Sequence, residues 1–158
     1  MVNILFICTG NICRSPLAEG ILRYKLKTVN IPSFIDSCGF ESFHEGDPPD
    51  SRAQATAFKH GLDISSHRAR LFSPEDFDRF DMIYVMDSSH YKNVMKVARK
   101  RSDMFKVDFI LNLLYPGKNL GVMDPWYHDE KAFEQVYLQL DQVCELISQK
   151  LINETNRL

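Results

Sequence analysis

The sequence predicts an α/β fold in which helices cover a parallel sheet. Short apolar runs alternate with longer segments of helical spacing along the chain, which is typical of crossover units around a parallel sheet. The length of 158 residues and the hydrophobic content of 44% suit one compact domain, because domains commonly run about 100–200 residues. We find no repeat, low-complexity tract or linker, so residues 1–158 are expected to form one domain.

Four regular segments are predicted in the first half: a strand at 2–7, a helix at 16–29, a strand at 34–36 and a helix from 50 to about 60. The first strand is an apolar run, and the first helix repeats apolar residues every three or four positions. Asp50 is a suitable cap and Gly61 a suitable end for the second helix. Residues 37–49 are rich in glycine and proline and predict a long loop with Phe40 and Phe43 exposed.

Six segments are predicted in the second half: a short strand at 69–71, a short helix opening at 73–76, a strand at 82–86, a helix from 88 to about 101, a strand at 105–110 and a helix at 130–152. The strand at 82–86 is wholly apolar, which indicates burial on both faces. Asp87 is placed to cap the helix after it. The last helix carries one apolar stripe, which predicts packing against the core.

The charge, apolar content and cysteine count of the chain argue against several classes of function. The 19 basic and 21 acidic residues leave a net charge of −2, so the chain as a whole does not attract nucleic acid or anionic lipid. The basic cluster KVARKR at 96–101 is best explained as a solvated helix face. The apolar start is too short to span a membrane and lacks the features of a signal peptide. Four scattered cysteines do not make a disulfide framework, so we expect a cytoplasmic protein with reduced thiols.

A cysteine and an arginine lie six positions apart directly after the first predicted strand. Residues 8–15 read CTGNICRS, and the glycine and small or polar residues allow the backbone to curl with its N–H groups inward. Ser15 and Pro16 suit a helix start, with Ser15 as cap and Glu19 in the first turn. The positive helix end then faces the loop, which predicts a site for a tetrahedral anion.

Cys8 is the candidate nucleophile of this anion site. The positive helix end favours the thiolate, which is the reactive form, and Arg14 offers a planar fork for two phosphate oxygens. A cysteine that ends a buried strand is more often only a small core residue. Here the strand, the loop, the arginine and the helix start converge on one point. Ser37 and Asp87 also belong to the carboxyl ends of predicted strands and are expected at the same edge of the sheet.

Asp124 is the candidate proton donor. A phosphate ester needs a proton for its leaving oxygen, and a nucleophile alone does not supply one. Asp124 is followed by Pro125, which stiffens the backbone, and by Trp126 and Tyr127, which can form flat apolar walls for an aromatic substrate. A lone Asp-Pro pair would indicate only a turn, so the catalytic interpretation depends on the cysteine motif.

Six segments spread over nearly the whole chain resemble the low-molecular-weight protein tyrosine phosphatase family. They are CTGNICRSP at 8–16, DSCG at 36–39, PDSRA at 49–53, SHRAR at 66–70, FDMIYVMDSS at 80–89 and DPWY at 124–127. Several phosphatase folds share a cysteine and arginine at this spacing, whereas GNICRSP with a distal Asp-Pro is specific to this family and its close relatives. The resemblance implies a four-stranded parallel sheet of order 2-1-3-4, with helices on both faces and the phosphate loop after strand 1.

The resemblance also implies a two-step reaction without metal or cofactor. Cys8 attacks phosphorus while Asp124 protonates the leaving group, and Asp124 then acts as a base when the phosphocysteine is hydrolysed. Arg14 and the loop amides hold the phosphoryl oxygens. The implied phosphate-binding residues are Thr9, Gly10, Asn11, Ile12, Cys13, Arg14 and Ser15. The implied substrate is a phosphotyrosine-containing protein, with tyrosine kinases among the candidates, and the product is inorganic phosphate.

Four further sets of roles follow from the resemblance. The residues implied to hold the loop in shape are Asn11, Ser37 and His67. Ser15 resembles the family's serine that hydrogen-bonds the thiolate, which implies that its hydroxyl serves Cys8 more than it caps the helix. The residues implied to set specificity are Ile12, Phe43, Trp126 and Tyr127. Cys13 resembles a cysteine that forms a reversible disulfide with Cys8 under peroxide, although the sequence leaves open that it is only a packing residue.

Several alternatives remain to be weighed. A protein-arginine phosphatase shares the fold and the chemistry, but such relatives tend to have threonine where this chain has Ile12. A non-catalytic anion-binding or thiol-redox module could use Cys8 and Cys13, but it would have no use for Asp124. Arsenate reductases of this fold need further cysteines, and a flavodoxin-like FMN carrier needs a hydroxyl-rich loop, so both fit poorly.

Overall fold

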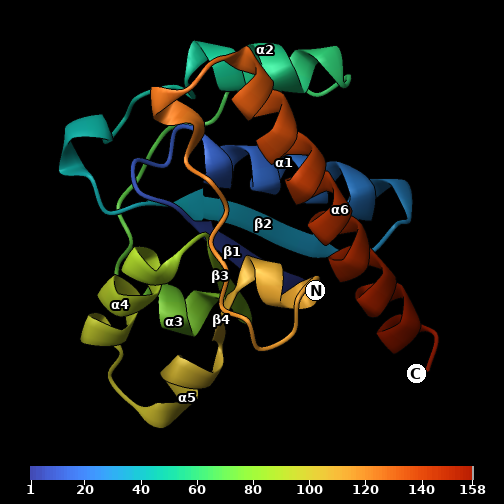
Figure 1. Cartoon of the computed structure of the whole chain (residues 1–158). Helices are drawn as coiled ribbons and strands as arrows, with labels where there is room; N and C mark the ends of the chain where they lie inside the picture. The colour runs from blue at the N-terminus through green and yellow to red at the C-terminus, as the bar shows by residue number, and fades with distance from the viewer. Residues whose placement is uncertain (158) are drawn as a thin grey trace.

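Four parallel strands form the centre of the computed structural model, which describes residues 1–157 (Figure 1). The strands are β1 (Val2–Ile7), β2 (Ser33–Cys38), β3 (Met82–Val85) and β4 (Val107–Phe109). Their order in the sheet is β2-β1-β3-β4, as the family resemblance implied. β1 lies in the middle, where Ile4 pairs with Ile35 on one side and Met82 on the other.

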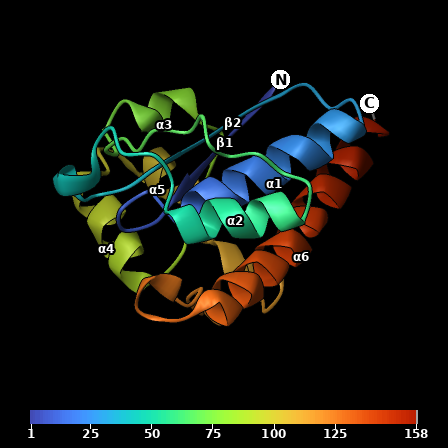
Figure 2. The same ribbon diagram turned by 90° about the horizontal axis from the view of Figure 1, so that it is seen from above.

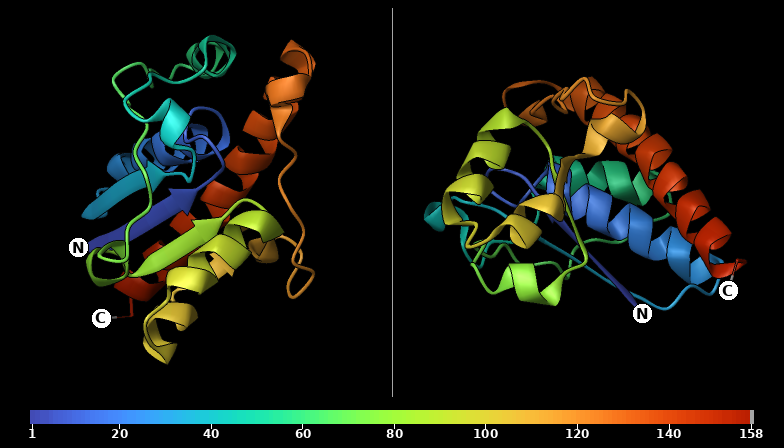
Figure 3. Two further views of the ribbon diagram at one scale, coloured as in Figure 1. Left: turned by 90° about the vertical axis from the view of Figure 1, so that its left-hand side faces the viewer. Right: turned by 90° about the horizontal axis from the view of Figure 1, so that it is seen from below.

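Helices cover both faces of this sheet, and the α/β prediction is confirmed. They are α1 (Arg14–Thr28), α2 (Ser51–Lys59), α3 (Asp76–Arg79), α4 (Ser88–Val97), α5 (Arg101–Phe105) and α6 (Glu130–Thr155). Three short 3₁₀ turns complete the chain: η1 (Ser42–His44), η2 (Ile110–Leu113) and η3 (Pro125–Tyr127). α1, α2 and α6 lie on one side of the sheet, and α3, α4 and α5 lie on the other (Figures 2 and 3).

The central strand explains why its sequence shows no polar alternation. Ile4 and Phe6 contribute to the core beneath α1 and α6, whereas Leu5 and Ile7 contribute to the core beneath α3 and α4. Side chains alternate between the faces of a strand, so the stretch that is buried on both faces, residues 4–7, is apolar at every position, whereas Asn3 near the start of β1 is only partly buried. Each such burial stabilises the fold by roughly 1.5–3 kcal/mol. The strand that precedes the phosphate loop is therefore a rigid support.

Most predicted boundaries shift by one to three residues in the structure, and two predictions differ more strongly. The segment 69–71 is not a strand but a single bridge between Leu71 and Gly39. The helix predicted to reach residue 101 ends at Val97, and α5 begins separately at Arg101. Asp103 accepts hydrogen bonds from the backbone N–H and the guanidinium of Arg99, which stabilises the break.

The structure shows the surroundings of the basic cluster and of the two loop aromatics for which the sequence predicts exposure. Arg99, from the basic cluster, pairs with Asp78 and Asp103. Phe43 is 84% exposed, as expected, but the prediction for Phe40 is wrong, because its ring packs on Phe72 with 5.7 Å between centroids. Within residues 1–157, no helix is both long and apolar enough to cross a membrane.

Candidate active site

The loop between β1 and α1 is folded so that its amides are free. The carbonyl of Thr9 accepts hydrogen bonds from the N–H groups of Phe40 and Glu41, and that of Ile12 accepts one from Asp50. Asn11 has a positive φ of 57°, a conformation that asparagine tolerates better than most residues. Among residues 1–157, the N–H groups of 9–15 have no hydrogen-bond partner. Together with the N-terminus of α1, they form a set of open donors of the kind that bind anions.

Ser15 does not cap α1, and its hydroxyl faces the sulfur of Cys8 instead, as the family resemblance implied. The helix begins at Arg14, two residues before the predicted start, and its N-cap position is Cys13. Glu19 accordingly lies beyond the first turn. The hydroxyl of Ser15 lies 2.9 Å from the sulfur of Cys8 and accepts a hydrogen bond from the side chain of Asn11. Because Asn11 supplies that donor, the hydrogen of Ser15 is available to the sulfur.

A buried polar network behind the loop holds this arrangement. The amide of Asn11 also donates to Ser37 at 2.9 Å, and Ser37 donates to Glu19 at 3.0 Å. His67 bridges the carboxylate of Glu19, at 3.1 Å, and the carbonyl of Asn11, at 3.1 Å. The structure thus brings together Asn11, Ser15, Ser37 and His67, and it adds Glu19. A network in which every member is paired makes the loop rigid.

Glu19 is charged despite its burial. Burial by itself would raise its pKa, but the hydrogen bond and charge of His67, with the pairing to Arg23, lower the pKa below the ordinary value for glutamate. The sequence analysis assigned Glu19 only to the helix dipole. A carboxylate on α1 and an imidazole 48 positions later share no local pattern, so only the fold could reveal this pair.

Arg14 is 2% exposed and is held from several sides. Its Nη1 donates to Asp87 at 3.1 Å and to the carbonyl of Val122 at 2.8 Å. Its Nη2 donates to the hydroxyl of Thr9 at 3.3 Å and lies 3.6 Å from an oxygen of Asp124. Burial alone would raise the pKa of Asp87, but Ser89, His90 and Arg14 lower it. The carboxylate therefore orients the guanidinium, a role that the sequence analysis did not assign to Asp87.

The loop that carries Asp124 approaches from the far end of the chain. Asp124 caps η3 by accepting the N–H of Trp126 at 3.1 Å. Arg52 of α2 donates to the carbonyls of Trp126 and His128, at 3.1 and 3.3 Å. Its guanidinium also lies over the ring of Phe133, 4.6 Å from the centroid. Arg52 therefore anchors this loop, and the sequence analysis gave it no role.

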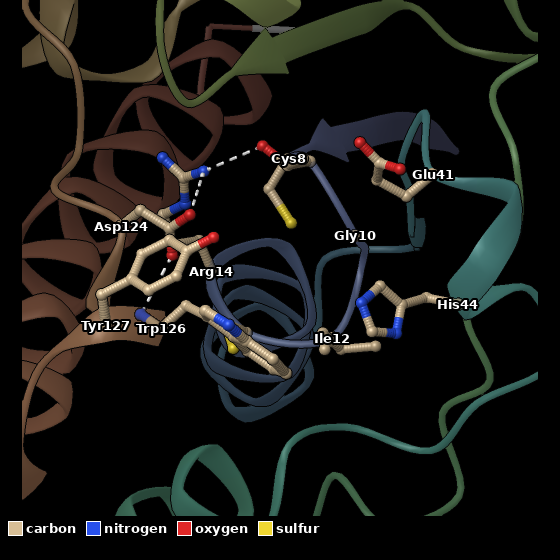
Figure 4. Close-up of a pocket in the computed structure, with 11 residues that line it drawn as sticks. Cys8, Gly10, Ile12, Arg14, Glu41, His44, Asp124, Trp126 and Tyr127 are labelled. Atoms are coloured by element: carbon tan, nitrogen blue, oxygen red, sulfur yellow. Dashed lines mark hydrogen bonds and ion pairs between the residues drawn. The ribbon is translucent and has the colours of Figure 1, made fainter.

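These segments enclose a cavity of about 180 Å³ (Figure 4). Its lining consists of Cys8, Thr9, Gly10, Ile12, Cys13, Arg14, Glu41, His44, Asp124, Trp126 and Tyr127. The sulfur of Cys8 points into the space between Arg14 and Asp124 on one side and His44 on the other. The three candidate catalytic residues are thus brought to one cavity from two ends of the sequence.

Some predicted site residues lie elsewhere, and two lining residues were missed. Asn11 and Ser15 are buried behind the loop and do not line the cavity. Phe43 also lies outside the lining, with its ring 5.0 Å from that of His44. Glu41 and His44 line the cavity but were not singled out in the sequence, because nothing in the glycine- and proline-rich loop indicates which side chains turn inward.

Comparisons with known proteins agree on one family. A family model described as "Low molecular weight phosphotyrosine protein phosphatase" matches residues 3–157. A curated protein of that name from Gallus gallus is 35% identical over 150 residues, which cover 94% of each chain. A solved protein tyrosine phosphatase from Entamoeba histolytica is 31% identical, with a TM-score of 0.89 over 100% of both chains.

A third similarity concerns the fold alone. The structure of YwlE arginine phosphatase, in a cysteine-to-serine mutant with a phosphorylated active-site serine, has a TM-score of 0.83 over 95% of both chains. It shares 20% sequence identity with this chain. At this identity the likeness shows a shared fold, and the substrate of this chain must be argued from the side chains of its cavity.

Proposed function

Because this chain belongs to the low molecular weight phosphotyrosine protein phosphatase family, we propose that it hydrolyses phosphotyrosine in proteins through a phosphocysteine intermediate. The whole chain acts as one phosphatase domain in this proposal. The observation that carries the proposal is the convergence of the Cys8 sulfur, the open loop amides, Arg14 and Asp124 on one cavity. A cysteine with only a structural role would not need open loop amides, Arg14 and Asp124 beside it.

In the first step, the sulfur of Cys8 attacks phosphorus, and the bond between phosphorus and the tyrosyl oxygen breaks. Asp124 gives its proton to that oxygen, so that neutral tyrosine leaves. The N–H groups of 9–15 and the guanidinium of Arg14 bind the three other oxygens. The Ser15 hydroxyl, 2.9 Å from the sulfur, supports its negative charge.

In the second step, water hydrolyses the phosphocysteine. Asp124, now a carboxylate, takes a proton from the attacking water, and the phosphorus–sulfur bond breaks to release inorganic phosphate and the Cys8 thiolate. The same carboxylate can serve both steps because it lines the cavity with Cys8 and lies 3.6 Å from Arg14, which binds the phosphoryl group in this proposal. No redox change occurs in either step.

The walls of the cavity favour an aromatic ester. Ile12 and Trp126 present apolar surface and Tyr127 an aromatic ring, and these suit the ring of phosphotyrosine. A phosphoarginine side chain is a cation next to its phosphoryl group and would gain less from such walls. Glu41 at the rim is the feature that could favour a guanidinium, so phosphoarginine is the second candidate substrate.

The proposal is tested with peptides that carry phosphotyrosine, phosphoserine or phosphoarginine in the same sequence context, assayed without added metal. We expect phosphotyrosine to have the highest kcat/KM. Phosphoarginine preference would change the substrate class but preserve the mechanism. A folded, reduced protein that hydrolyses none of the three would contradict the proposed function.

Arg52 is expected to affect catalysis by holding the Asp124 loop. Arg52→Met removes the donors to the carbonyls of Trp126 and His128 but keeps an apolar stem over Phe133. We expect kcat/KM for a phosphotyrosine peptide to fall by about tenfold, because catalysis depends steeply on the placement of the proton donor. Affinity for inorganic phosphate should not change. Arg79→Met, far from the cavity, is the matched control, and an equal loss in both variants would contradict this role.

Oxidation is expected to inactivate the protein reversibly through Cys8 and Cys13. Burial, with the neighbouring Cys8, raises the pKa of the Cys13 thiol well above the ordinary value, so peroxide should oxidise Cys8 first. The sulfenic acid on Cys8 then condenses with the Cys13 thiol, releasing water and forming a disulfide. After peroxide treatment, dithiothreitol should restore less activity to Cys13→Ala than to wild type, while Cys144→Ala should recover fully. Equal recovery in all three would show that Cys13 does not protect Cys8.

A further inference from the structure

His90 is a buried imidazole that the proposed chemistry does not use. It lies in the first turn of α4 and is 1% exposed. Its Nδ1 accepts the backbone N–H of Asp87 at 3.2 Å, which completes the capping of the helix. A ring nitrogen that accepts a hydrogen bond carries no hydrogen, so in the neutral ring the hydrogen belongs to Nε2.

The surroundings keep the ring neutral. Burial lowers the pKa of His90 to about 4, and the positive charge of Arg14 also lowers it. The carboxylates of Asp87 and Asp124 raise this pKa, but their effect is smaller than that of burial. At neutral pH the ring is therefore uncharged, and the hydrogen bond from the Asp87 N–H to Nδ1 favours the tautomer in which Nε2 carries the hydrogen and donates. The direction of the hydrogen bond at Nε2 follows from this.

The partner of Nε2 is the hydroxyl of Thr9, at 2.8 Å. The same oxygen accepts a hydrogen bond from Nη2 of Arg14 at 3.3 Å. A hydroxyl has two lone pairs and one hydrogen, so these two donors use its accepting capacity. Neither Nε2 of His90 nor Nη2 of Arg14 can accept a hydrogen bond in return. Among residues 1–157, no acceptor lies within hydrogen-bond reach of the hydrogen on the Thr9 hydroxyl.

Thr9 lines the cavity beside Cys8 and Arg14. The acceptor for its hydroxyl hydrogen is therefore expected to belong to a molecule bound in this cavity. We propose that the hydroxyl of Thr9 donates a hydrogen bond to an oxygen of the transferred phosphoryl group, and that His90 is the positioning residue that holds it in this orientation. The inference rests on the proposed function for the identity of the anion. It adds a side-chain donor to a loop otherwise described by its amides and Arg14.

Donation to a phosphoryl oxygen fits the chemistry of both groups. Phosphoryl oxygens only accept hydrogen bonds. A hydroxyl that rotates freely would lose rotational entropy when it binds such an oxygen, and this loss would offset part of the binding free energy. The hydroxyl of Thr9 is fixed before the substrate arrives, since two donors already occupy its lone pairs. Such preorganised donors stabilise the charge that spreads over the equatorial oxygens during transfer.

Orthovanadate, an analogue of the transferred phosphoryl group, provides a direct test. Thr9→Val keeps the shape of the side chain but removes the hydroxyl, and we expect vanadate affinity and kcat/KM to fall by about tenfold or more. Thr9→Ser should remain close to wild type. Thr28→Val, which removes an exposed hydroxyl bonded to the Tyr24 carbonyl, is the matched control. Unchanged vanadate affinity in Thr9→Val would overturn the proposal.

The role of His90 is tested by non-additivity. His90→Leu should weaken vanadate binding, and the double variant Thr9→Val, His90→Leu should be no weaker than Thr9→Val alone, because His90 acts through the hydroxyl. His90→Gln, whose amide can both accept and donate, should recover part of the loss. Additive losses in the double variant would show that His90 acts in another way and would overturn its assignment. Circular dichroism establishes that each variant is folded.

The tautomer provides a further test of the direction of the hydrogen bond between His90 and Thr9. Nitrogen chemical shifts of His90 should show hydrogen on Nε2 and none on Nδ1 from pH 8 to pH 5. The opposite tautomer would make Thr9 the donor to His90 and would overturn the proposal. Because vanadate binding and the tautomer are measured without turnover, they remain informative if phosphotyrosine hydrolysis itself is not found.

Discussion

Cys8→Ala should abolish hydrolysis of a phosphotyrosine peptide, with a loss on the order of 10⁵-fold or more, because the variant has no nucleophile with which to form the intermediate. Alanine is preferable to serine, because a serine hydroxyl is itself a nucleophile. The anion site should survive, because its donors are the backbone N–H groups of residues 9–15 and the side chains of Arg14 and Thr9, none of which involves the sulfur of Cys8. Calorimetry should therefore show that Cys8→Ala still binds inorganic phosphate.

Cys144→Ala is the matched control for this loss. Cys144 is also a buried thiol, and its pKa is raised by burial, but it packs between α6 and α1, where its nearest polar contact is the carbonyl of Ala18. We expect normal activity from this variant. Loss of phosphate binding in Cys8→Ala, or turnover within about tenfold of wild type, would contradict the role of Cys8 as nucleophile.

Asp124→Asn should lower kcat for phosphotyrosine by about 10²–10⁴-fold, the usual contribution of a positioned general acid. Asparagine is chosen because its side-chain oxygen can still accept the N–H of Trp126, so η3 should keep its cap. The loss should be smaller for an aryl phosphate whose leaving group is a weaker base than tyrosine, because such a group departs without a proton. Steady-state rates on the two substrates measure this difference.

Asp129→Asn provides the matched control for Asp124. Asp129 lies on the same loop and caps α6 by accepting the N–H of Ala132, and asparagine preserves that cap as well. The variant should retain nearly full activity on both substrates. An Asp124→Asn loss that is equal for good and poor leaving groups would show that the carboxylate positions the substrate and does not protonate it.

Much of the fold and the centre of the site could be predicted from the sequence, because their causes are local. The apolar run of β1 requires burial on both faces, and the spacing of Cys8 and Arg14 around a curled loop indicates an anion site. Asp50 and Asp87 cap helices where the pattern placed them. The resemblance of six segments to one family supplied the strand order and the link to Asp124.

Several contacts that set the site's geometry were not predicted, because they join distant parts of the chain and leave no local pattern. Arg14 meets Asp87 after 73 positions, and Thr9 meets His90 after 81. Arg52 reaches the loop of Trp126 across 74 positions. Each of these residues has an ordinary local role, such as a helix cap or an exposed helix position, and only tertiary packing adds the second role.

The central claim is that phosphate passes through a covalent bond to Cys8, and trapping that species tests the claim most directly. Asp124→Asn should accumulate it from a radiolabelled aryl phosphate with a good leaving group, because the first step then needs no proton while the second lacks its base. After rapid denaturation and proteolysis, we expect one labelled phosphoryl group on Cys8 and none in Cys8→Ala. Turnover without a labelled protein, or label on a different residue, would contradict the account.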